Sequence, residues 1–549
     1  MTRSHAAPLR PFRPLTRLAP LALAAFLAAC AHLPGPGEPP RALDAQFAGQ
    51  SLIAQHQDGT APATLGTWWR DFDDPALTAI VQRALDQNLD LAIAIARVDQ
   101  ARAAAQGAGA ARLPQGAVQG QLLSQRQSLK SPEGSLAHGF PGYDRNQTLQ
   151  TLGIGASWEA DLAGGLRQGE AAAVAEWQAA EAARLGARVT VAAEAADAYF
   201  RVRGAQARIE VAEAHLRTQS QLLQLIQDRF KGGLAAQREV AEAQALQLAA
   251  RGTLPPLRTE LAQQQHRLDI LMGEQAGTYA AKLLARPSAS STSSSTSSSA
   301  SPSTASSWSS RPSTYRVPSL PGDLTPATLM RRRPDVIAAE RQLDASQARI
   351  GVATAEYYPR LTLGGVLGAS SLHGGLFSSQ AFQPQALLGL HWRLFDFGRV
   401  DAEVAQAKGA RAEALAQVRQ RMLRATEDVE NAIVTLSELE QQRGDLTQEV
   451  RAHQVARDAA EDAYKGGAAS LIEVLQEDRL LLAARDQLAQ LDANHARAAV
   501  SAFRAFGGGW DAPEAMTATD PAARPDTQPV PPSPTTALVS PNAAGVMAR

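Results

Sequence analysis

Apolar residues fall on every second position in two short stretches of the chain, 151–159 and 388–394. One face of the first stretch carries Leu152, Ile154, Ala156 and Trp158, and one face of the second carries Leu388, Leu390, Trp392 and Leu394. Alternation over about ten residues, with an aromatic near one end, is typical of a membrane-spanning β-strand. Their partner strands are expected around 117–124 and 360–369. Taken singly, each pair fits a soluble hairpin with one buried face equally well.

Long segments with almost no proline and little glycine predict helices in much of the remaining chain. The clearest runs from about residue 166 to 230, and an unbroken helix of that length measures about 95 Å. Such a helix is longer than a globular domain, so we expect it to pair with another in a coiled-coil-like hairpin. Further helices are expected at 75–112, 233–272, 399–463 and 469–506.

The order of these segments repeats within the chain. Asp228–Arg251 aligns without a gap on Asp462–Arg485, with identity at 12 of 24 positions, at a shift of 462 − 228 = 234 residues. Upstream, Pro114 corresponds to Pro359 at a shift of 359 − 114 = 245. Similarity at a fixed period indicates duplicated structure. Each copy is therefore expected to contain a helix, two strands and a long helical hairpin that reverses at a Lys-Gly-Gly turn.

The segments outside the two copies differ from them in composition. We expect a signal peptide at 1–29, a lipid-anchored tether at 30–74, the first repeat at 75–273, a linker at 274–318, the second repeat at 319–508 and a disordered tail at 509–549. The linker includes the serine-rich run 288–313, which has too little apolar surface to fold.

The first thirty residues have the pattern of an exported lipoprotein. Several arginines precede the apolar run 18–29, which ends in Leu27-Ala28-Ala29-Cys30. A basic start, a short apolar core and small residues before the cut describe a secretory signal, and Leu-Ala-Ala-Cys resembles the lipobox of bacterial lipoproteins. The resemblance implies cleavage before Cys30 and a covalent lipid on that residue. Ala31, in place of aspartate, favours the outer membrane. The alternative is a buried cysteine that ends an apolar helix.

Charge and motifs narrow the possible functions. The net charge is −1, so no nucleic-acid surface is expected. No HExxH, GxSxG, P-loop or paired Cys/His motif points to catalysis, a metal or a bound cofactor.

After the signal, no apolar run approaches the ~20 residues of a transmembrane helix. Four strands per chain fall short of the smallest single-chain barrel, which has eight. Several chains must therefore combine to close a barrel, as a dimer with 8 strands or a trimer with 12. A closed barrel continued by long helices would be a conduit.

Three segments resemble the TolC-like outer membrane factors, in the NodT-type lipoprotein branch that serves RND drug efflux systems. They are WWRDFDDPALTAIVQRALDQNLDLAIAIARVDQARA at 68–103, LPGDLTPATLMRRRPDVIAAERQLDASQARIG at 320–351 and WRLFDFGR at 392–399. The resemblance covers most of residues 1–508. It implies a mixed α/β membrane protein: a homotrimer with a 12-stranded transmembrane β-barrel, four strands per chain, an equatorial belt and a long periplasmic α-helical barrel.

The resemblance also implies a function and partners. The duct would conduct small molecules such as drugs out of the cell, as the outer membrane part of a tripartite efflux pump. A periplasmic adaptor and an inner-membrane RND-type transporter would complete the pump, and the energy would be spent in the transporter.

Several residues receive roles from this resemblance. The periplasmic tips, which would gate the closed end and contact the adaptor, correspond to Lys231, Gly232 and Gly233 and to Lys465, Gly466 and Gly467. Glu473 falls where the family often has an acidic ring at the pore constriction, although Gln476 occupies the family's second acidic position. Trp158 and Trp392 are expected in the aromatic girdle of the barrel. A bland alternative is that the glycines only cap helices and that Glu473 is a solvated surface carboxylate.

Other functions stay open on the sequence alone. An enzyme is disfavoured by the missing motifs. An adhesive trimeric coiled coil would explain the helices, but neither the hairpins nor the duplication. The same duct could serve type I protein secretion or metal efflux. Methionine is sparse, with 6 residues, which favours drug-type molecules over metal ions.

Overall fold

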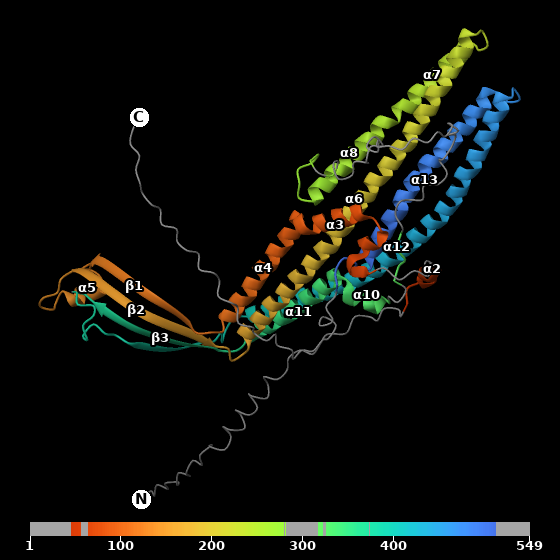
Figure 1. Cartoon of the computed structure of the whole chain (residues 1–549). Helices are drawn as coiled ribbons and strands as arrows, with labels where there is room; N and C mark the ends of the chain where they lie inside the picture. The colour runs from red at the N-terminus through yellow and green to blue at the C-terminus, as the bar shows by residue number, and fades with distance from the viewer. Residues whose placement is uncertain are drawn as a thin grey trace, which may run out of the picture. The chain divides into compact units, whose positions relative to one another are not determined.

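The computed structural model describes residues 46–55, 64–278, 280, 317–321, 325–372 and 374–511 (Figure 1). Its elements, in chain order, are α2 (Gln50–Gln55), η1 (Leu65–Phe72), α3 (Pro75–Gln87), α4 (Leu89–Ala110), β1 (Gln115–Arg126), α5 (Pro132–Ala137), β2 (Asn146–Ala160), α6 (Gly165–Lys231), α7 (Gln237–Gly252), α8 (Leu254–Leu271), α10 (Pro326–Arg332), α11 (Pro334–Ala355), β3 (Arg360–Ser371), β4 (Gln385–His391), α12 (Arg399–Lys465) and α13 (Leu471–Ala505).

The four strands form one antiparallel sheet in the order β1-β2-β3-β4. The two predicted hairpins are β1–β2 and β3–β4, and β2 pairs with β3 to join them. The alternating pattern placed Trp392 and Leu394 in the last strand, but β4 ends at His391. The last pair of this ladder joins His391 to Arg360. The residue that would face Trp392 is Pro359, which has no N–H to continue the ladder.

The duplication is confirmed down to the helix caps. Helices α6 and α12 contain 67 residues each, and each follows a glycine in the left-handed region, Gly164 with φ 76° and Gly398 with φ 86°. A side chain at this positive φ would be strained, so glycine is required there. Just upstream, the carboxylates of Asp161 and Asp396 each accept a 2.8 Å hydrogen bond from a backbone N–H of the first helical turn.

Two of the predicted helices are interrupted. The helix expected at 75–112 breaks at Asn88, whose side-chain oxygen accepts hydrogen bonds from two N–H groups at the start of α4. The Asn88 amide also donates to the carbonyl of Leu271 at 2.9 Å, which fixes the corner against α8. The helix expected at 233–272 breaks at Thr253, before two consecutive prolines that remove backbone donors.

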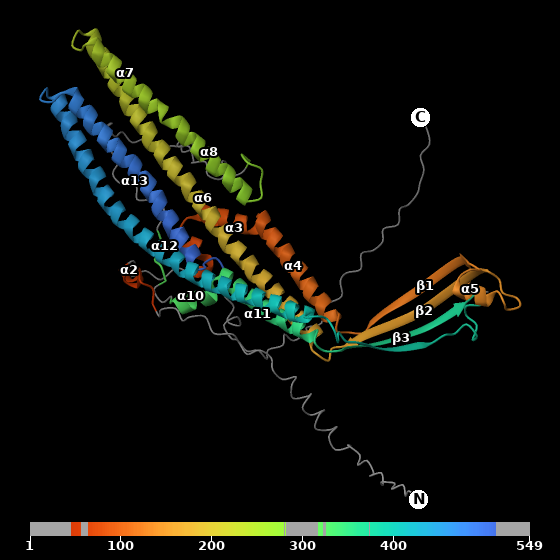
Figure 2. The ribbon, with the colours of Figure 1, turned by 180° about the vertical axis from the view of Figure 1, so that it is seen from behind.

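The sheet and the Lys-Gly-Gly turns lie at opposite ends of the long helices (Figures 1 and 2). Helices α7 and α8 return along α6, and α13 returns along α12, so each repeat contributes one helical hairpin. None of the helices among the described residues is both long enough and apolar enough to cross a membrane.

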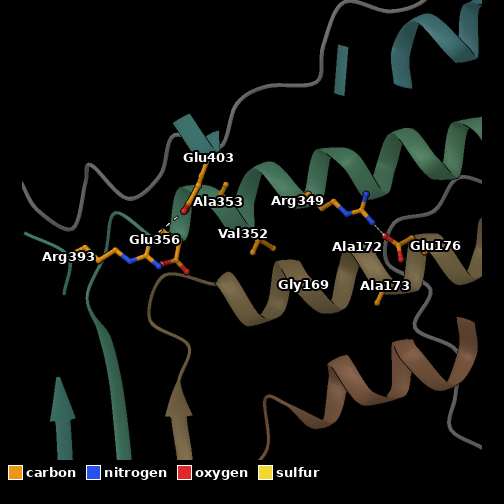
Figure 3. Close-up of a pocket in the computed structure, with 10 residues that line it drawn as sticks. All are labelled: Gly169, Ala172, Ala173, Glu176, Arg349, Val352, Ala353, Glu356, Arg393 and Glu403. Carbon is orange, nitrogen blue, oxygen red and sulfur yellow. Dashed lines mark hydrogen bonds and ion pairs between the residues drawn. The ribbon is translucent and has the colours of Figure 1, made fainter. Parts of the chain in front are cut away.

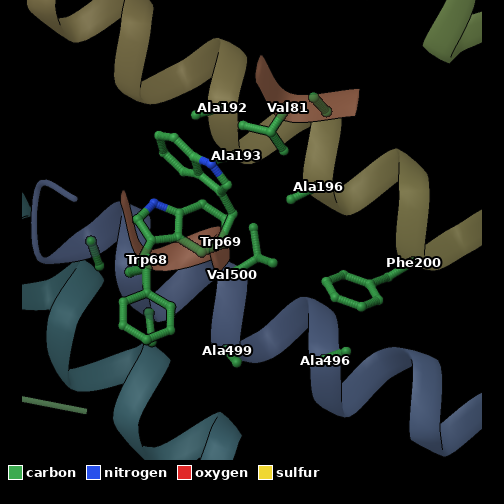
Figure 4. Packing of buried hydrophobic residues seen from close by; sticks show 14 of the residues in the cluster. Trp68, Trp69, Val81, Ala192, Ala193, Ala196, Phe200, Ala496, Ala499 and Val500 are labelled. Atoms are coloured by element: carbon green, nitrogen blue, oxygen red, sulfur yellow. The ribbon is translucent and has the colours of Figure 1, made fainter. Parts of the chain in front are cut away.

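One large apolar cluster joins elements from both repeats (Figure 4). Trp68 of η1 stacks on Phe503 of α13, with ring centroids 5.3 Å apart and ring planes 4° apart. Phe200 of α6 packs against Phe72 at 5.2 Å. The surrounding positions of α6 and α13 are mostly alanine, including Ala196 and those labelled in Figure 4, so the two helices approach closely. The core therefore joins the two repeats near the middle of the long helices α6 and α12.

Candidate functional site

One face of the sheet is apolar and is not covered by the described chain. The register places Val118, Ile154 and Leu367 in one row across three strands, and these side chains are 70%, 62% and 66% exposed. Leu363 and Leu388 form a further row on the same face. Exposed apolar surface of this extent marks a contact with lipid or with another protein.

Both edges of the sheet lack a partner strand within the described residues. β1 pairs only with β2, and β4 pairs only with β3. An unpaired row of N–H and C=O groups is not tolerated in lipid, because no water satisfies it there. In lipid, a sheet with an exposed apolar face and two open edges needs a neighbouring strand at each edge.

The two tryptophans expected in an aromatic girdle occupy equivalent places at the helix side of the sheet. The indole Nε1–H of Trp158 donates to the carbonyl oxygen of Arg112 at 2.9 Å, and that of Trp392 donates to the carbonyl oxygen of Tyr357 at 3.0 Å. The acceptors are themselves 357 − 112 = 245 residues apart, which is the shift of the upstream repeat. Each tryptophan therefore ties the end of its hairpin to the residues just after the helix that precedes the hairpin.

A cavity of about 470 Å³ lies where the helices meet the sheet, between α6, α11 and the start of α12 (Figure 3). Its charged lining residues pair with one another. Arg393 lies 3.1 Å from Glu356 and 3.5 Å from Glu403, and Arg349 pairs with Glu176. Because these charges are compensated, the cluster fastens α11 and α12 to the end of β4. The sequence did not predict this cluster of ion pairs, although Arg393 belongs to the WRLFDFGR segment.

The two Lys-Gly-Gly turns are built alike and lie exposed at the far ends of α6 and α12. Gly233 and Gly467 adopt positive φ angles of 73° and 77°. In the first turn the N–H groups of Gly233 and Leu234 donate back to the carbonyls of Phe230 and Arg229, and the second turn repeats both bonds. This is the Schellman ending of a helix, which places glycine at the left-handed position.

The turns also touch one another, a contact that the sequence did not predict. The Arg229 guanidinium donates to the Tyr464 hydroxyl and lies over the Tyr464 ring, 5.4 Å from the ring centroid. The two side chains lie next to the two turns, 464 − 229 = 235 residues apart. The sequence offers little that would predict this contact. Arg229 and Tyr464 each lie one or two residues before a Lys-Gly-Gly turn, but they are not equivalent positions when the two copies are aligned.

Glu473 is exposed in the first turn of α13 and caps that helix. Its carboxylate accepts hydrogen bonds from the Ser470 hydroxyl at 2.9 Å and from the Ser470 N–H at 3.2 Å. These bonds lower the pKa of Glu473, the hydroxyl contributing most, so the carboxylate is charged at neutral pH. The first repeat has Ala236 in place of Ser470, so the pairing is particular to the second tip.

Cys30 and the serine-rich run 288–313 lie outside the described residues. Within the described ranges, no group of three or more His, Cys, Asp or Glu side chains could hold a metal ion.

The comparisons with known proteins agree on one family. The profile described as "Outer membrane efflux protein" matches residues 80–274 and 326–508. The pyoverdine export outer membrane protein OpmQ of Pseudomonas putida is 31% identical over 449 residues, 81% of this chain and 88% of that protein. The cation efflux system protein CusC of Escherichia coli O6:H1 is 26% identical over 498 residues, 90% of this chain and 99% of that protein.

A solved structure supports the same assignment. The outer-membrane channel OprN is 28% identical, superposes with a TM-score of 0.72, and the match covers 87% of this chain and 100% of that one. Because the family profile spans more than half of the sequence and the fold agrees, this chain belongs to the outer membrane efflux protein family.

Proposed function

We propose that three copies of this chain form the outer membrane exit duct of a tripartite efflux pump. The observation that carries the proposal is the four-stranded sheet with an uncovered apolar face and two open edges. Three such sheets joined edge to edge give a closed barrel of 12 strands. The duct does no chemistry and passively conducts what its partners deliver.

The two ends of the molecule are the proposed contact sites for its partners. The exposed Lys-Gly-Gly turns would contact a periplasmic adaptor, which connects the duct to an inner-membrane RND-type transporter. Lys231, Gly232 and Gly233 would form one contact, and Lys465, Gly466 and Gly467 the other. At the opposite end, Trp158 and Trp392 would sit in the aromatic girdle, and a covalent lipid on Cys30 would anchor the chain.

Small organic molecules are the proposed cargo. The names of the relatives cover more than one class, since OpmQ is named for pyoverdine export and CusC for cation efflux. Metal efflux paths are favoured by soft ligands such as methionine, and this chain has only 6 methionines. Metal efflux is the second candidate, because the relative CusC is named as a cation efflux protein.

Native mass spectrometry of the full-length protein, extracted from outer membranes in mild detergent, tests the duct. We expect a trimer of chains that begin at Cys30, each heavier by its lipid. A Cys30→Ser variant should carry no lipid yet keep the trimer, because the strands rather than the lipid close the barrel. A monomeric wild-type protein would refute the duct, since four strands cannot close alone.

Glu473→Gln should reduce the preference of the channel for cations without unfolding α13. Glutamine can still accept the bonds of the helix cap, so the substitution removes charge and keeps structure. Three carboxylates around a constriction attract cations, and the loss should appear in the reversal potential across a salt gradient in planar bilayers. The matched control is Glu239→Gln, at the equivalent position of the first repeat. Unchanged cation preference in Glu473→Gln would remove Glu473 from the constriction.

A further inference from the structure

The two helical hairpins meet along α6 and α13, and polar pairs bridge the contact at intervals. We call this contact the seam. Its bridging pairs are Asp197 with Arg497 (2.7 Å), Arg208 with Asp486 (2.9 and 3.1 Å) and Gln219 with Asp478 (3.0 Å). The helices run antiparallel, so these pairs progress from the sheet side toward the tips.

The sheet-side half of the seam is tightly packed. A Cβ added at Gly204 would lie 2.6 Å from the Cβ of Ala493, so the two backbones are in close contact there. Below this point the buried residues of α6, such as Phe200 and Ala196, belong to the core shared with α13 (Figure 4). This half cannot separate without exposing apolar surface.

The tip-side half is held differently. Beyond Ala205, the buried apolar residues of α6 pack on their own hairpin: Ala212 against Leu254 and Leu257 of α8, and Leu223 and Ile226 against Ala243 of α7. Toward α13, polar side chains bridge this half: Arg208 pairs with Asp486 and Gln219 with Asp478. The hairpins can therefore part at the tips while each keeps its own apolar packing.

His215 lies in this tip-side half of the seam. Its Nδ1 is 3.7 Å from Oδ2 of Asp478, and the two side chains are only 15% and 14% exposed. That carboxylate already has partners, because Oδ2 accepts from Gln219 and Oδ1 lies 3.6 Å from Nε of Arg457 on α12. Gln219 is itself buried, and its Oε1 accepts no hydrogen bond from the described residues.

The other elements around His215 carry charges of both signs, most of them paired with one another. On the α8 side, Arg258 pairs with Glu213 at 3.1 Å. On α13, Arg485 is half-buried near Asp478, and on α12 the charges of Arg457 and Asp458 lie in the same layer. Arg457 pairs with Glu461 as well as with Asp458. The Asp478 carboxylate is already shared by Gln219, Arg457 and Arg485, and a protonated His215 would compete with them for it.

We propose that His215 makes the seam pH-responsive: the neutral imidazole fits the closed seam, and its protonation favours separation of the hairpin tips. The inference rests on the proposed duct, and it identifies periplasmic acidification as a signal that opens the periplasmic end.

The direction follows from linkage. Burial lowers the pKa of His215 from its ordinary value of 6.5, and the Asp478 carboxylate offsets only part of this effect. A group with a lower pKa in the closed state binds its proton preferentially in the open state, where the imidazole is solvated. Above pH 6.5 the closed seam keeps its full stability, and it loses stability as the pH falls through 6.5 toward the lowered pKa.

The proposal can be tested by measuring the open probability of the purified full-length trimer in planar bilayers at pH 7.5 and at pH 5.5. We expect a rise of about threefold or more for the wild type at the acidic pH. His215→Gln, which is polar and uncharged at both values, should abolish the rise. The matched control is His453→Gln: His453 lies 3.5 Å from Glu477 within the second hairpin and does not bridge the seam. This variant should rise like the wild type.

A rise in His215→Gln equal to that of the wild type, or no rise in the wild type, would overturn the proposal and leave the duct intact. Absence of any conductance at either pH would refute the duct as well. Hydrogen exchange on the wild type needs no variant: residues 208–231 of α6 should exchange faster at pH 5.5, after correction for intrinsic rates, and residues 189–204 should not. Equal protection of both stretches at the two pH values would also overturn it.

Discussion

Trp68→Ala is expected to destabilise the protein strongly. Trp68 is 1% exposed, stacks on Phe503 and meets Trp69 and Phe72 edge-on at 5.6 and 6.0 Å. Removing a buried tryptophan costs about 3–5 kcal/mol, through lost apolar burial and the cavity left behind. Because η1 and α13 come from opposite ends of the chain, the loss also loosens the junction of the two repeats.

Thermal denaturation of the purified trimer and its amount in the outer membrane measure this effect. Trp68→Phe should cost clearly less, since it keeps an aromatic ring against Phe503. Phe377→Ala, at a side chain that is 90% exposed, should change neither quantity. If Trp68→Ala melted at the wild-type temperature, the aromatic cluster would not be what holds the repeats together.

The sequence predicted the repeated architecture because the relevant patterns are local. Period-2 alternation is a property of a single strand, and it placed Leu152, Ile154 and Trp158 on one face, as observed. The shift of 234 residues held through both long helices because neither copy has an insertion between Gly164 or Gly398 and the glycine turn. Glycines at the turns were identified because a helix that reverses needs a left-handed residue.

What the sequence did not predict depends on contacts between distant residues. Asn88 breaks a helix because its amide reaches the carbonyl of Leu271 as well as the next N–H groups, and only the second of these is local. Glu430 on α12 accepts hydrogen bonds from the N–H groups of Ala48 and Gly49, across more than 380 residues. A single sequence carries no signal for such pairs.

Arg229→Ala is expected to raise the conductance of the proposed duct, because it loosens the contact between the two helical hairpins beside the tip turns. The substitution removes both the hydrogen bond to the Tyr464 hydroxyl and the cation–π contact with its ring. Each such exposed contact stabilises by about 0.5–1 kcal/mol, so the ratio of closed to open states should fall about fivefold per protomer. If the three tips part together, these factors multiply to about two orders of magnitude. Basal conductance in planar bilayers should rise accordingly.

Two control variants distinguish loss of the Arg229–Tyr464 contact from a general loss of positive charge at the tip. Tyr464→Phe keeps the ring beneath Arg229 and loses only the hydroxyl, so its effect should be smaller than that of Arg229→Ala. Lys231→Ala alters a neighbouring cation whose ion pair, with Asp228 at 3.1 Å, stays within its own helix, so it should leave conductance unchanged. Equal leakage in Lys231→Ala and Arg229→Ala would mean that positive charge at the tip, rather than the contact between the two turns, keeps the duct closed.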